Sequence, residues 1–186
     1  MRSQLFPALF LDRDGVINHD YGYVHRRESF DFINGIFELA RYAHERKYKL
    51  VVISNQAGIA RGFYSEQRFH QLTGWMCEQF SLAGAPISRV YFSPYHPTEG
   101  IGQYLSDDIS RKPHPGMILQ AQRDLTIDLS RSILIGDKAS DIQAGNAAGV
   151  GTNLLLGPDC PTELNGLNYH RINTLLEAKK YLVASI

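Results

Sequence analysis

The sequence predicts an α/β fold of the Rossmann-like, doubly wound type with a mainly parallel sheet. Short runs of consecutive apolar residues alternate along the chain with segments in which apolar residues recur at helical spacing. The runs are apolar at every position, which indicates strands that are buried on both faces. Polar residues directly follow several of these runs, as expected where the strands of an open α/β sheet end at a ligand site. Together these patterns favour a parallel sheet covered by helices on both faces.

Five apolar runs are predicted to form the strands. The first, at residues 8–11, stops at Asp12, and the second, at 50–53, is followed by Ser54 and Asn55. The other three strands are expected at residues 90–92, 133–135 and 154–156.

Helices are expected between these strands. Apolar residues repeat at helical spacing over 36–43, and Ser65 is placed to cap the next helix. One face of that second helix is apolar and contains Phe69, Leu72, Met76 and Phe80. A long loop follows the third strand, and Pro115 is suited to a helix start. The last two helices are expected at 141–148, closed by Gly149, and at 175–182.

Composition limits the classes of function. The length of 186 residues suits a single domain that spans 1–186. Lys plus Arg equals Asp plus Glu at 19 each, so no overall positive field draws the protein to nucleic acid or anionic lipid. Cys77 and Cys160 are the only cysteines, which argues against a disulfide framework. The apolar stretch near the N-terminus is too short to span a membrane. We therefore expect a cytoplasmic protein without nucleic-acid or membrane partners.

The segment Asp12-Arg13-Asp14-Gly15 is the most informative for chemistry. Two carboxylates at i and i+2 on an extended strand end point the same way, and Arg13 is expected to point away. Such a pair suits Mg²⁺, with one carboxylate as nucleophile and the other as proton shuttle. The alternative is a solvated turn, because Asp and Gly are common turn residues. A calcium loop fits less well, because its required Gly and carboxylate positions hold Ile17 and Tyr23.

Three further segments carry candidate groups. Asp137 follows a predicted strand and can supply a metal oxygen, while Lys138 can steady a carboxylate or phosphate. Asp141 is either a residue at the helix start or a support for the metal ligands. Ser54 and Asn55 can donate hydrogen bonds to phosphate, and the cations Arg111 and Lys112 can neutralise its charge. Each segment alone is more simply explained as a polar turn or a solvated basic pair. Their combination favours a phosphoryl-transfer site.

These segments resemble the motifs of the haloacid dehalogenase (HAD) superfamily of phosphatases. The four motifs correspond to residues 10–15, 53–55, Lys112 and 136–141. Within the superfamily the chain is similar to the D-glycero-D-manno-heptose 1,7-bisphosphate phosphatase family, and the similarity is carried by residues 20–25, 55–62 and 111–117.

The resemblance implies a HAD-like fold without a large cap domain. It implies a Mg²⁺-dependent hydrolase that removes the C7 phosphate of a heptose bisphosphate through an aspartyl-phosphate intermediate. The reaction would belong to nucleotide-activated heptose biosynthesis, which supplies lipopolysaccharide precursors. The partner would be the small phosphorylated sugar, and we expect a monomer.

The resemblance also implies a role for each matching residue. Asp12 would be the nucleophile and a magnesium ligand, and Asp14 would be the general acid and base with its backbone carbonyl on the metal. Asp137 would complete the protein ligands, and Ser54 with Lys112 would hold the transferred phosphoryl group. The remaining substrate contacts would come from Asp20, Tyr21, Gly22, Tyr23, Asn55, Gln56, Ala57, Arg111 and Lys138, of which Arg111 recognises the rest of the substrate and Lys138 orients the acidic cluster.

The chain departs from the family in one loop. The family usually holds a structural zinc through a Cys-x-His and Cys-x-Cys arrangement before the Arg-Lys pair. The corresponding positions here are Ser93, Tyr95, Asp108 and Ser110. Hydroxyl groups are poor zinc ligands beside thiolate and imidazole, so we expect no structural zinc. The loop would then be held by packing, with Tyr91, Tyr95 and Tyr104 as candidates.

Two alternatives remain open. The first is a histidinol-phosphate phosphatase, which shares the chemistry; the run at 114–117 and the presence of Lys138 favour the heptose family over it. The second is a catalytically silent protein that binds a phosphorylated sugar. A silent relative is expected to have lost Asp12 or Asp14, and both are present.

Overall fold

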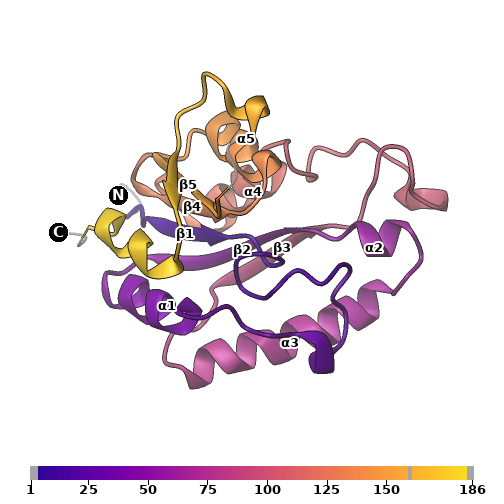
Figure 1. The fold of residues 1–186 in the computed structure, drawn as a ribbon, viewed down its shortest axis with the longest axis horizontal. Helices are drawn as coiled ribbons and strands as arrows, with labels where there is room; N and C mark the ends of the chain where they lie inside the picture. Colours follow the sequence, from indigo (N-terminus) through magenta and orange to yellow (C-terminus); the bar gives the residue numbers. More distant parts are fainter. Residues whose placement is uncertain (1–3, 159–160, 184–186) are drawn as a thin grey trace.

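The protein folds around one parallel sheet in the computed structural model, which describes residues 4–158 and 161–183 (Figure 1). Cys160 lies outside the described residues. The sheet has six strands within the described chain, in the order β3-β2-β1-β4-β5-β6. All neighbouring strands run parallel. The strands are β1 (Ala8–Leu11), β2 (Lys49–Asn55), β3 (Arg89–Ser93), β4 (Ile133–Gly136), β5 (Thr152–Leu156) and β6 (His170–Ile172).

Helices cover both faces of this sheet. Figure 1 shows α1 and α3 on one face and α4 and α5 on the other. The helices are α1 (Ile36–Glu45), α2 (Ala57–Ala60), α3 (Glu66–Leu82), α4 (Gly116–Leu125) and α5 (Ala139–Ala148). Short 3₁₀ segments are η1 (Arg27–Ser29), η2 (Gly102–Tyr104), η3 (Leu129–Arg131), η4 (Thr162–Leu164) and η5 (Leu175–Tyr181).

The alternation of side chains along β1 divides the core into two layers. Leu9 and Leu11 pack in the cluster that includes apolar residues of α1, α3 and η5. Ala8 and Phe10 pack in the other cluster, with residues of α4 and α5. All four side chains are fully buried, as expected for a central strand of a doubly wound sheet. The predicted fold class is confirmed.

Most predicted elements are confirmed, with four corrections. The five predicted strands are present, and the Ser65 hydroxyl caps α3 by accepting a hydrogen bond from the Arg68 amide at 3.2 Å. The prediction missed the short strand β6 and the four-residue helix α2. The expected helix at 175–182 is the 3₁₀ segment η5 instead. Helix α5 begins at Ala139, two residues before the predicted start, and Gly149 ends it with φ +80°.

The topology places one edge of the sheet at a natural binding position. β1 lies between β2 and β4, so the chain leaves the centre of the sheet in opposite directions on its two sides. Ligands of open α/β sheets bind at the carboxyl ends of strands beside such a point. The loops that follow β1, β2, β3 and β4 meet at this edge. No helix within residues 4–158 and 161–183 is long and apolar enough to cross a membrane.

Candidate active site

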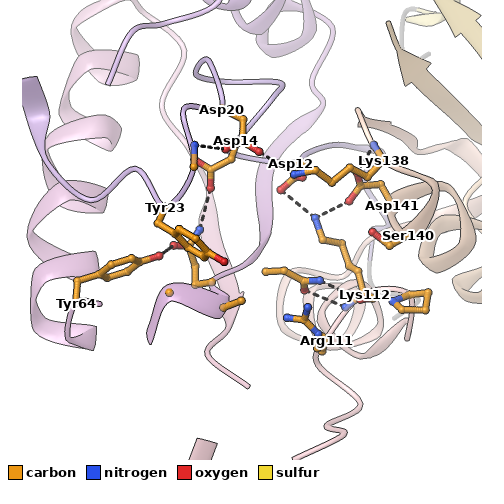
Figure 2. A pocket seen from close by; sticks show the side chains of 16 residues that line it. Asp12, Asp14, Asp20, Tyr23, Tyr64, Arg111, Lys112, Lys138, Ser140 and Asp141 are labelled. Atoms are coloured by element: carbon orange, nitrogen blue, oxygen red, sulfur yellow. Dashed lines mark hydrogen bonds and ion pairs between the residues drawn. The ribbon is translucent and has the colours of Figure 1, made fainter. Parts of the chain in front are cut away.

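A cavity of about 600 Å³ opens at the carboxyl edge of the sheet (Figure 2). It brings together residues from the ends of β1, β2 and β4, from the loop after β1 and from the loop before α4. Of the residues predicted to form the site, those that line it are Asp12, Asp14, Asp20, Gly22, Tyr23, Asn55, Gln56, Ala57, Arg111, Lys112 and Lys138. Segments far apart in the sequence thus meet as the strand-end pattern indicated.

The ammonium group of Lys112 lies in the floor of the cavity. Its Nζ lies 2.9 Å from Asp12 Oδ1 and 2.6 Å from Asp141 Oδ1. It also donates a hydrogen bond to the carbonyl oxygen of Ile53 at 3.1 Å. Burial alone would lower the pKa of Lys112, but the Asp12 and Asp141 carboxylates outweigh it and raise the pKa above its ordinary value. Lys112 is therefore a fixed cation beside the predicted nucleophile.

Asp12 stands at the end of β1 and is nearly fully buried. Its Oδ1 accepts hydrogen bonds from the Arg13 amide at 2.7 Å and from Lys112. Burial raises the pKa of Asp12 to about 7; Lys112 acts against this rise, and Asp141 and Asp137 add to it. A carboxylate in such a place gains from a further cation, because its charge is poorly solvated.

The carboxylates of Asp12, Asp137 and Asp141 form an acidic cluster. One oxygen from each lies within 4.8 Å of the others. Asp137 Oδ1 is buried and has no hydrogen-bond partner within the described residues. Burial also raises the pKa of Asp137 to about 6. An unpartnered buried carboxylate oxygen beside a second carboxylate fits a hard dication such as Mg²⁺.

Asp141 stands at the start of α5 and also contacts the Lys112 ammonium. Its Oδ2 accepts a hydrogen bond from the Lys138 amide at 3.0 Å and completes a capping box at the start of α5. Its Oδ1 contacts Lys112. Because both oxygens are engaged, Asp141 supports Lys112 and is less suited to bind a metal than Asp12 or Asp137.

Gly15 makes room for this cluster. Its φ is +93°, and a Cβ atom there would lie 2.1 Å from Asp137 Oδ2. Any other residue would push Asp137 away or strain the turn. The glycine at the end of the Asp12–Gly15 segment therefore serves two purposes: the turn of the chain and the close approach of Asp137.

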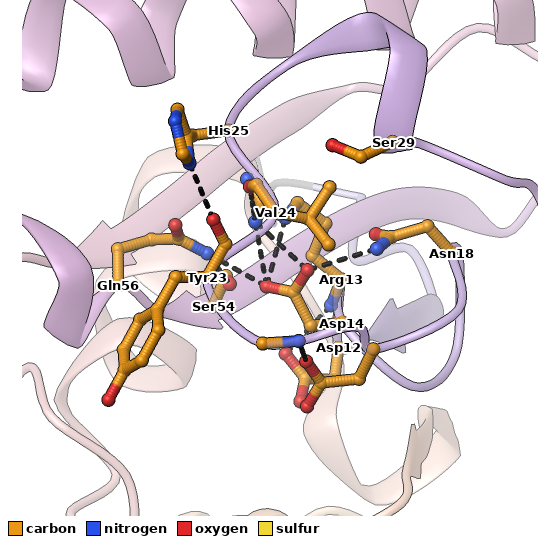
Figure 3. A network of polar contacts seen from close by, with 12 residues as sticks. Asp12, Arg13, Asp14, Asn18, Tyr23, Val24, His25, Ser29, Ser54 and Gln56 are labelled. Atoms are coloured by element: carbon orange, nitrogen blue, oxygen red, sulfur yellow. Dashed lines mark hydrogen bonds and ion pairs between the residues drawn. The ribbon is translucent and has the colours of Figure 1, made fainter. Parts of the chain in front are cut away.

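Asp14 lies in a network of donors, and one expectation about its neighbour is wrong (Figure 3). Arg13 was expected to point away, but its guanidinium reaches Asp14, with Nε 3.1 Å from Oδ2 and Nη2 2.9 Å from Oδ1. Asn18 and Gln56 donate further hydrogen bonds to the same carboxylate at 3.0 and 3.1 Å. β1 ends at Leu11 and Arg13 lies in the turn that follows, so strand alternation does not fix the direction of its side chain.

The segment after Gly15 forms one wall of the cavity. The Lys138 ammonium contacts Asp20 Oδ2 at 2.9 Å, and the Asp20 Oδ1 accepts from the Gly22 amide at 3.0 Å. Burial opposes ionisation of Asp20, but the hydrogen bonds from Lys138 and the Gly22 amide, together with the positive charges of Lys138 and Arg13, outweigh it and lower the pKa of Asp20. Tyr23 packs edge-on against Phe63, with 4.8 Å between ring centroids. The wall is thus attached to the start of α5 by an ion pair and to the loop before α3 by a ring contact.

Residues after β2 and β3 complete the opposite side. Asn55 exchanges two hydrogen bonds with the backbone of Lys112, at 2.9 and 3.0 Å, so it positions that residue. Gln56 donates to Ser54 Oγ at 2.7 Å and accepts from the Tyr64 hydroxyl at 2.6 Å. Arg111 donates to the carbonyl oxygen of Tyr95 at 3.0 Å.

Three predicted residues lie outside the cavity lining. Tyr21 is 62% exposed, and its hydroxyl donates to Asp31 Oδ2 at 2.9 Å. Ser54 is buried beneath Gln56, and Asp137 lies beneath Gly15. The lining residues that the prediction did not assign to substrate or catalysis are Gly58, Tyr64, Pro113, Ser140 and Asp141.

Tyr64 is the clearest of these omissions. A Cβ at Gly58 would lie 2.2 Å from the Tyr64 ring, so the glycine admits the tyrosine. Burial raises the pKa of Tyr64 to about 12. A single tyrosine before a helix does not show in the sequence that its ring reaches the cavity. The one sequence feature related to it is Gly58, one of the two glycines that follow β2.

The positions that correspond to the family's zinc ligands are joined by hydrogen bonds. Ser110 Oγ donates to Ser93 Oγ at 3.0 Å, and Asp108 Oδ1 accepts from the Ser110 amide at 2.8 Å. Tyr95 and Tyr104 make the expected ring contact, with 6.2 Å between centroids, whereas Tyr91 packs in the core. The loop is therefore held by polar contacts as well as by packing.

Known proteins match both the sequence and this fold. A family model described as HAD-hydrolase-like matches residues 109–171. The D-glycero-alpha-D-manno-heptose-1,7-bisphosphate 7-phosphatase of Burkholderia mallei (strain ATCC 23344) is 58% identical over 149 residues, which are 80% of this chain and 79% of that protein. This chain belongs to the heptose bisphosphate 7-phosphatase family of HAD hydrolases. Members of this family are phosphatases, and the chain is a phosphoric monoester hydrolase.

Further comparisons agree with membership of the heptose bisphosphate 7-phosphatase family. The D-glycero-beta-D-manno-heptose-1,7-bisphosphate 7-phosphatase of Vibrio cholerae serotype O1 is 48% identical and covers 86% of each chain. A Mesorhizobium loti structure described as a HAD-like phosphatase has a TM-score of 0.85 at 32% identity, over 99% of this chain and 90% of that one. The D,D-heptose 1,7-bisphosphate phosphatase from B. bronchiseptica, complexed with magnesium and phosphate, has a TM-score of 0.79 at 21% identity. It covers 95% of this chain and 97% of its own, and it supports the fold.

Proposed function

We propose that the enzyme removes the C7 phosphate of D-glycero-D-manno-heptose 1,7-bisphosphate and releases heptose 1-phosphate. The observation that carries the chemistry is Asp12, a buried carboxylate at the cavity floor held 2.9 Å from the Lys112 ammonium. The family relation carries the choice of substrate. We assign the reaction to the synthesis of nucleotide-activated heptose, as in the heptose family.

In the first step, a carboxylate oxygen of Asp12 attacks phosphorus and the bond between phosphorus and the C7 oxygen breaks. The leaving alkoxide takes a proton from Asp14, so the sugar departs as a neutral alcohol. The amide of Arg13 and the ammonium of Lys112 hold Asp12 in place. Lys112 and the Ser54 hydroxyl would hold the transferred phosphoryl group, and the ammonium of Lys112 would balance part of its charge.

In the second step, a water molecule attacks the phosphorus of the aspartyl phosphate. Asp14 takes a proton from this water, the bond between Asp12 and phosphorus breaks, and inorganic phosphate leaves. Asp14 returns to its protonated form and Asp12 returns as a carboxylate. One acid–base residue therefore serves both steps because the leaving group and the water occupy the same side of phosphorus.

The acidic cluster would hold Mg²⁺ through the side chains of Asp12 and Asp137 and the backbone carbonyl of Asp14. The ion would neutralise the repulsion between the Asp12 carboxylate and the phosphate dianion. The unpartnered Asp137 Oδ1 supports this assignment. Chelation is expected to stop turnover and added Mg²⁺ to restore it, whereas full activity in chelator would contradict the metal assignment.

The second phosphate needs a second group of donors. Arg111 lies on the cavity wall, and its guanidinium can bind a phosphate through two N–H groups. Burial, and then the neighbouring Arg61, lower the pKa of Arg111, so an anion at this position would relieve an unfavourable environment. We assign the C1 phosphate to Arg111, with Asp20, Tyr23, Gln56 and Lys138 around the sugar. The substrate contacts of Tyr21 and Ala57 remain predictions.

The test is a phosphate-release screen over both anomers of heptose 1,7-bisphosphate, simple sugar monophosphates and histidinol phosphate. We expect the bisphosphate to be used most efficiently. Arg111→Ala should weaken use of the bisphosphate by about 1.5–3 kcal/mol in kcat/KM and affect monophosphates less. Equal use of all substrates by the wild type, or equal losses in the variant, would reject the heptose assignment and leave the phosphatase chemistry intact.

Each alternative function has its own outcome in this screen. Preference for histidinol phosphate would place the chain with that sister activity. Binding of the bisphosphate without phosphate release would indicate a silent binding protein. The presence of Asp12, Asp14 and Lys112 in one cavity favours catalysis over both binding alone and a scaffold role.

Three further expectations belong to this proposal. We infer that residues 1–186 act as one domain, that the enzyme works as a cytoplasmic monomer, and that it binds no structural zinc. The hydrogen bonds among Ser93, Asp108 and Ser110 support the last point, because they occupy the positions of the family's zinc ligands. Metal analysis of untagged protein would contradict it by finding one tightly bound zinc per chain.

A further inference from the structure

Arg13 is a deeply buried charged residue beside the site, and the proposed mechanism gives its side chain no role. Arg13 is 2% exposed and is the largest of the fully buried side chains. A buried guanidinium is costly unless its charge and its N–H groups are paired. Arg13 Nη1 is buried and makes no hydrogen bond of ordinary geometry among the described residues, although the guanidinium also interacts with the Tyr64 side chain. An apolar side chain of similar volume would fill this space at lower cost, which points to a purpose other than packing.

The paired N–H groups of Arg13 join two parts of the active site (Figure 3). Nε and Nη2 form a two-point contact with the Asp14 carboxylate at 3.1 and 2.9 Å. Nη2 also donates to the carbonyl oxygen of Val24 at 2.7 Å. Val24 is buried directly after the wall segment that contains Gly22 and Tyr23. One planar group therefore fixes both the acid–base carboxylate and the end of the substrate wall.

Asn18 and Gln56 make the other hydrogen bonds to the Asp14 carboxylate. Gln56 follows β2 and donates to Asp14 Oδ2 at 3.1 Å and to Ser54 Oγ at 2.7 Å. The Tyr64 hydroxyl fixes the other end of the Gln56 amide. Asp14 is thus held by three side chains, and Arg13 is the only charged one among residues 4–158 and 161–183 that donates to its carboxylate. Two parallel N–H bonds fix a carboxylate in a plane, which a single ammonium cannot do.

We propose that Arg13 is a positioning residue that aligns Asp14 with the leaving group by tying its carboxylate to the substrate wall at Val24. The inference rests on the proposed role of Asp14 as general acid and base. It predicts that loss of the two-point contact between the Arg13 guanidinium and Asp14 impairs proton transfer more than phosphoryl transfer itself. A residue that served stability alone would affect every substrate in the same proportion.

Substrates with different leaving groups distinguish a positioning role of Arg13 from a role in stability alone. A sugar alkoxide needs a proton to depart, whereas p-nitrophenolate departs without one. We expect Arg13→Lys to lower kcat about 10²-fold for a sugar monophosphate that the wild type cleaves. The pre-steady-state burst of p-nitrophenol from p-nitrophenyl phosphate should change less than about threefold, because this step needs no general acid.

A double-mutant cycle tests whether Arg13 acts through Asp14. The double variant R13K/D14N should be no slower than D14N alone toward the sugar phosphate, since the positioned group has been removed. Arg89→Lys is the matched control, because Arg89 forms an exposed pair with Asp124 far from the cavity, at 3.3 Å. Its kcat should match the wild type. Equal losses for both substrates, or a further loss in the double variant, would overturn the proposal.

A measurement on folded protein guards against misfolding of Arg13→Lys. The side-chain Nε–H resonance of Arg13 should be protected from solvent exchange in the wild type and should shift in Asp14→Asn. An exchanging or unshifted resonance would overturn the proposed pairing without any Arg13 variant. These readouts use any sugar phosphate that is cleaved, so they are independent of whether the heptose bisphosphate is the preferred substrate.

Discussion

Lys112 shows how one side chain can stabilise the fold and prepare a nucleophile. Its ammonium satisfies Asp12, Asp141 and the Ile53 carbonyl oxygen in a site that excludes water. Two carboxylates next to one another would repel, and the buried cation removes most of that repulsion. Because the same contacts fix the direction of Asp12, a change at Lys112 must affect folding and chemistry together.

We therefore predict that Lys112→Met abolishes turnover and lowers the free energy of unfolding by about 3–5 kcal/mol, the usual cost of breaking a buried ion pair by removing one partner. Urea unfolding of the metal-free protein, with phosphate release in parallel, measures both effects. Lys179→Met is the control, because Lys179 pairs with the exposed Glu38 on the surface. An unfolding midpoint for Lys112→Met as high as that of the control would contradict the stabilising role.

Gly15, like Lys112, serves both the fold and the site, because it forms a turn and leaves space for Asp137. Gly15→Ala should displace Asp137, because the added Cβ would lie 2.1 Å from Asp137 Oδ2. We expect at least about a tenfold loss of Mg²⁺ affinity, as is usual when a metal ligand is disturbed, together with loss of turnover. Titration calorimetry with Mg²⁺ measures the change in affinity.

Gly84→Ala provides a matched control for this turn. Gly84 has φ +77°, and its Cβ would meet no atom within 4 Å. The Gly84→Ala substitution therefore introduces backbone strain of the same kind as Gly15→Ala, about 1–2 kcal/mol, without moving a carboxylate. Similar Mg²⁺ affinities in the two variants would show that Gly15 serves only the turn.

The start of α3 allows a test of helix capping. Ser65 Oγ accepts a hydrogen bond from the Arg68 amide at 3.2 Å, so Ser65→Ala should lower the free energy of unfolding by about 1 kcal/mol. Ser81→Ala, near the other end of the same helix, removes only a bond to the Cys77 carbonyl oxygen and should have little effect. Equal losses in thermal unfolding would contradict the cap assignment.

The sequence predicted the fully buried elements well and missed the short or exposed ones. Strands β1, β2 and β4 are buried along nearly their whole length, so each appears as an unbroken apolar run. β6 has three residues, of which His170 and Arg171 are exposed, and it carries no such run. Helix α2 is too short to show a period. The 3₁₀ form of η5 was missed because a spacing of three or four residues fits either helix type.

At the scale of the whole molecule, metal binding and protonation compete. Burial raises the pKa of Asp12 to about 7 and that of Asp137 to about 6, both above their ordinary value of 3.8. The folded metal-free protein therefore binds more protons than the unfolded chain between about pH 4 and 7, and these two groups make it less stable as the pH rises through this range. Mg²⁺ needs ionised carboxylates, so its affinity changes in the opposite direction.

We predict that a fixed Mg²⁺ concentration raises the melting temperature more at pH 8 than at pH 6. With Mg²⁺ at about 100 times its Kd, the stabilisation at the higher pH should approach 2.7 kcal/mol. Thermal scans in chelator and in Mg²⁺ at both pH values provide the comparison. Asp137→Asn, which lacks one of the two titrating groups, should reduce the difference between the two pH values. An equal Mg²⁺ effect at pH 6 and pH 8 would contradict the linkage.

Site residues that stand at strand ends were predictable from the sequence. The contacts of long side chains that reach other segments were less predictable. Asp12 and Asn55 stand at the ends of neighbouring parallel strands, so the topology brings them to one edge. Lys112 comes from the loop before α4, and hydrogen bonds to Asn55 hold its backbone there. Arg13 was predicted to point away, because alternation along a strand says nothing of where a long flexible side chain ends. Tyr64 reaches the cavity only because Gly58 leaves space for its ring, and a space of this kind is a property of the folded backbone.

The position of Lys112 also bears on how the chain reaches its native state. The contacts of this one ammonium join β1, the end of β2 and the start of α5, which come from the beginning, middle and later part of the chain. Such contacts are highly non-local, and the loops between them must close before the ion pairs can form. Helices and single strand pairs can appear earlier, because they close shorter loops. Recovery of phosphatase activity during refolding therefore reports the last stage of assembly, and no fragment that lacks either half of the sheet contains the catalytic cluster.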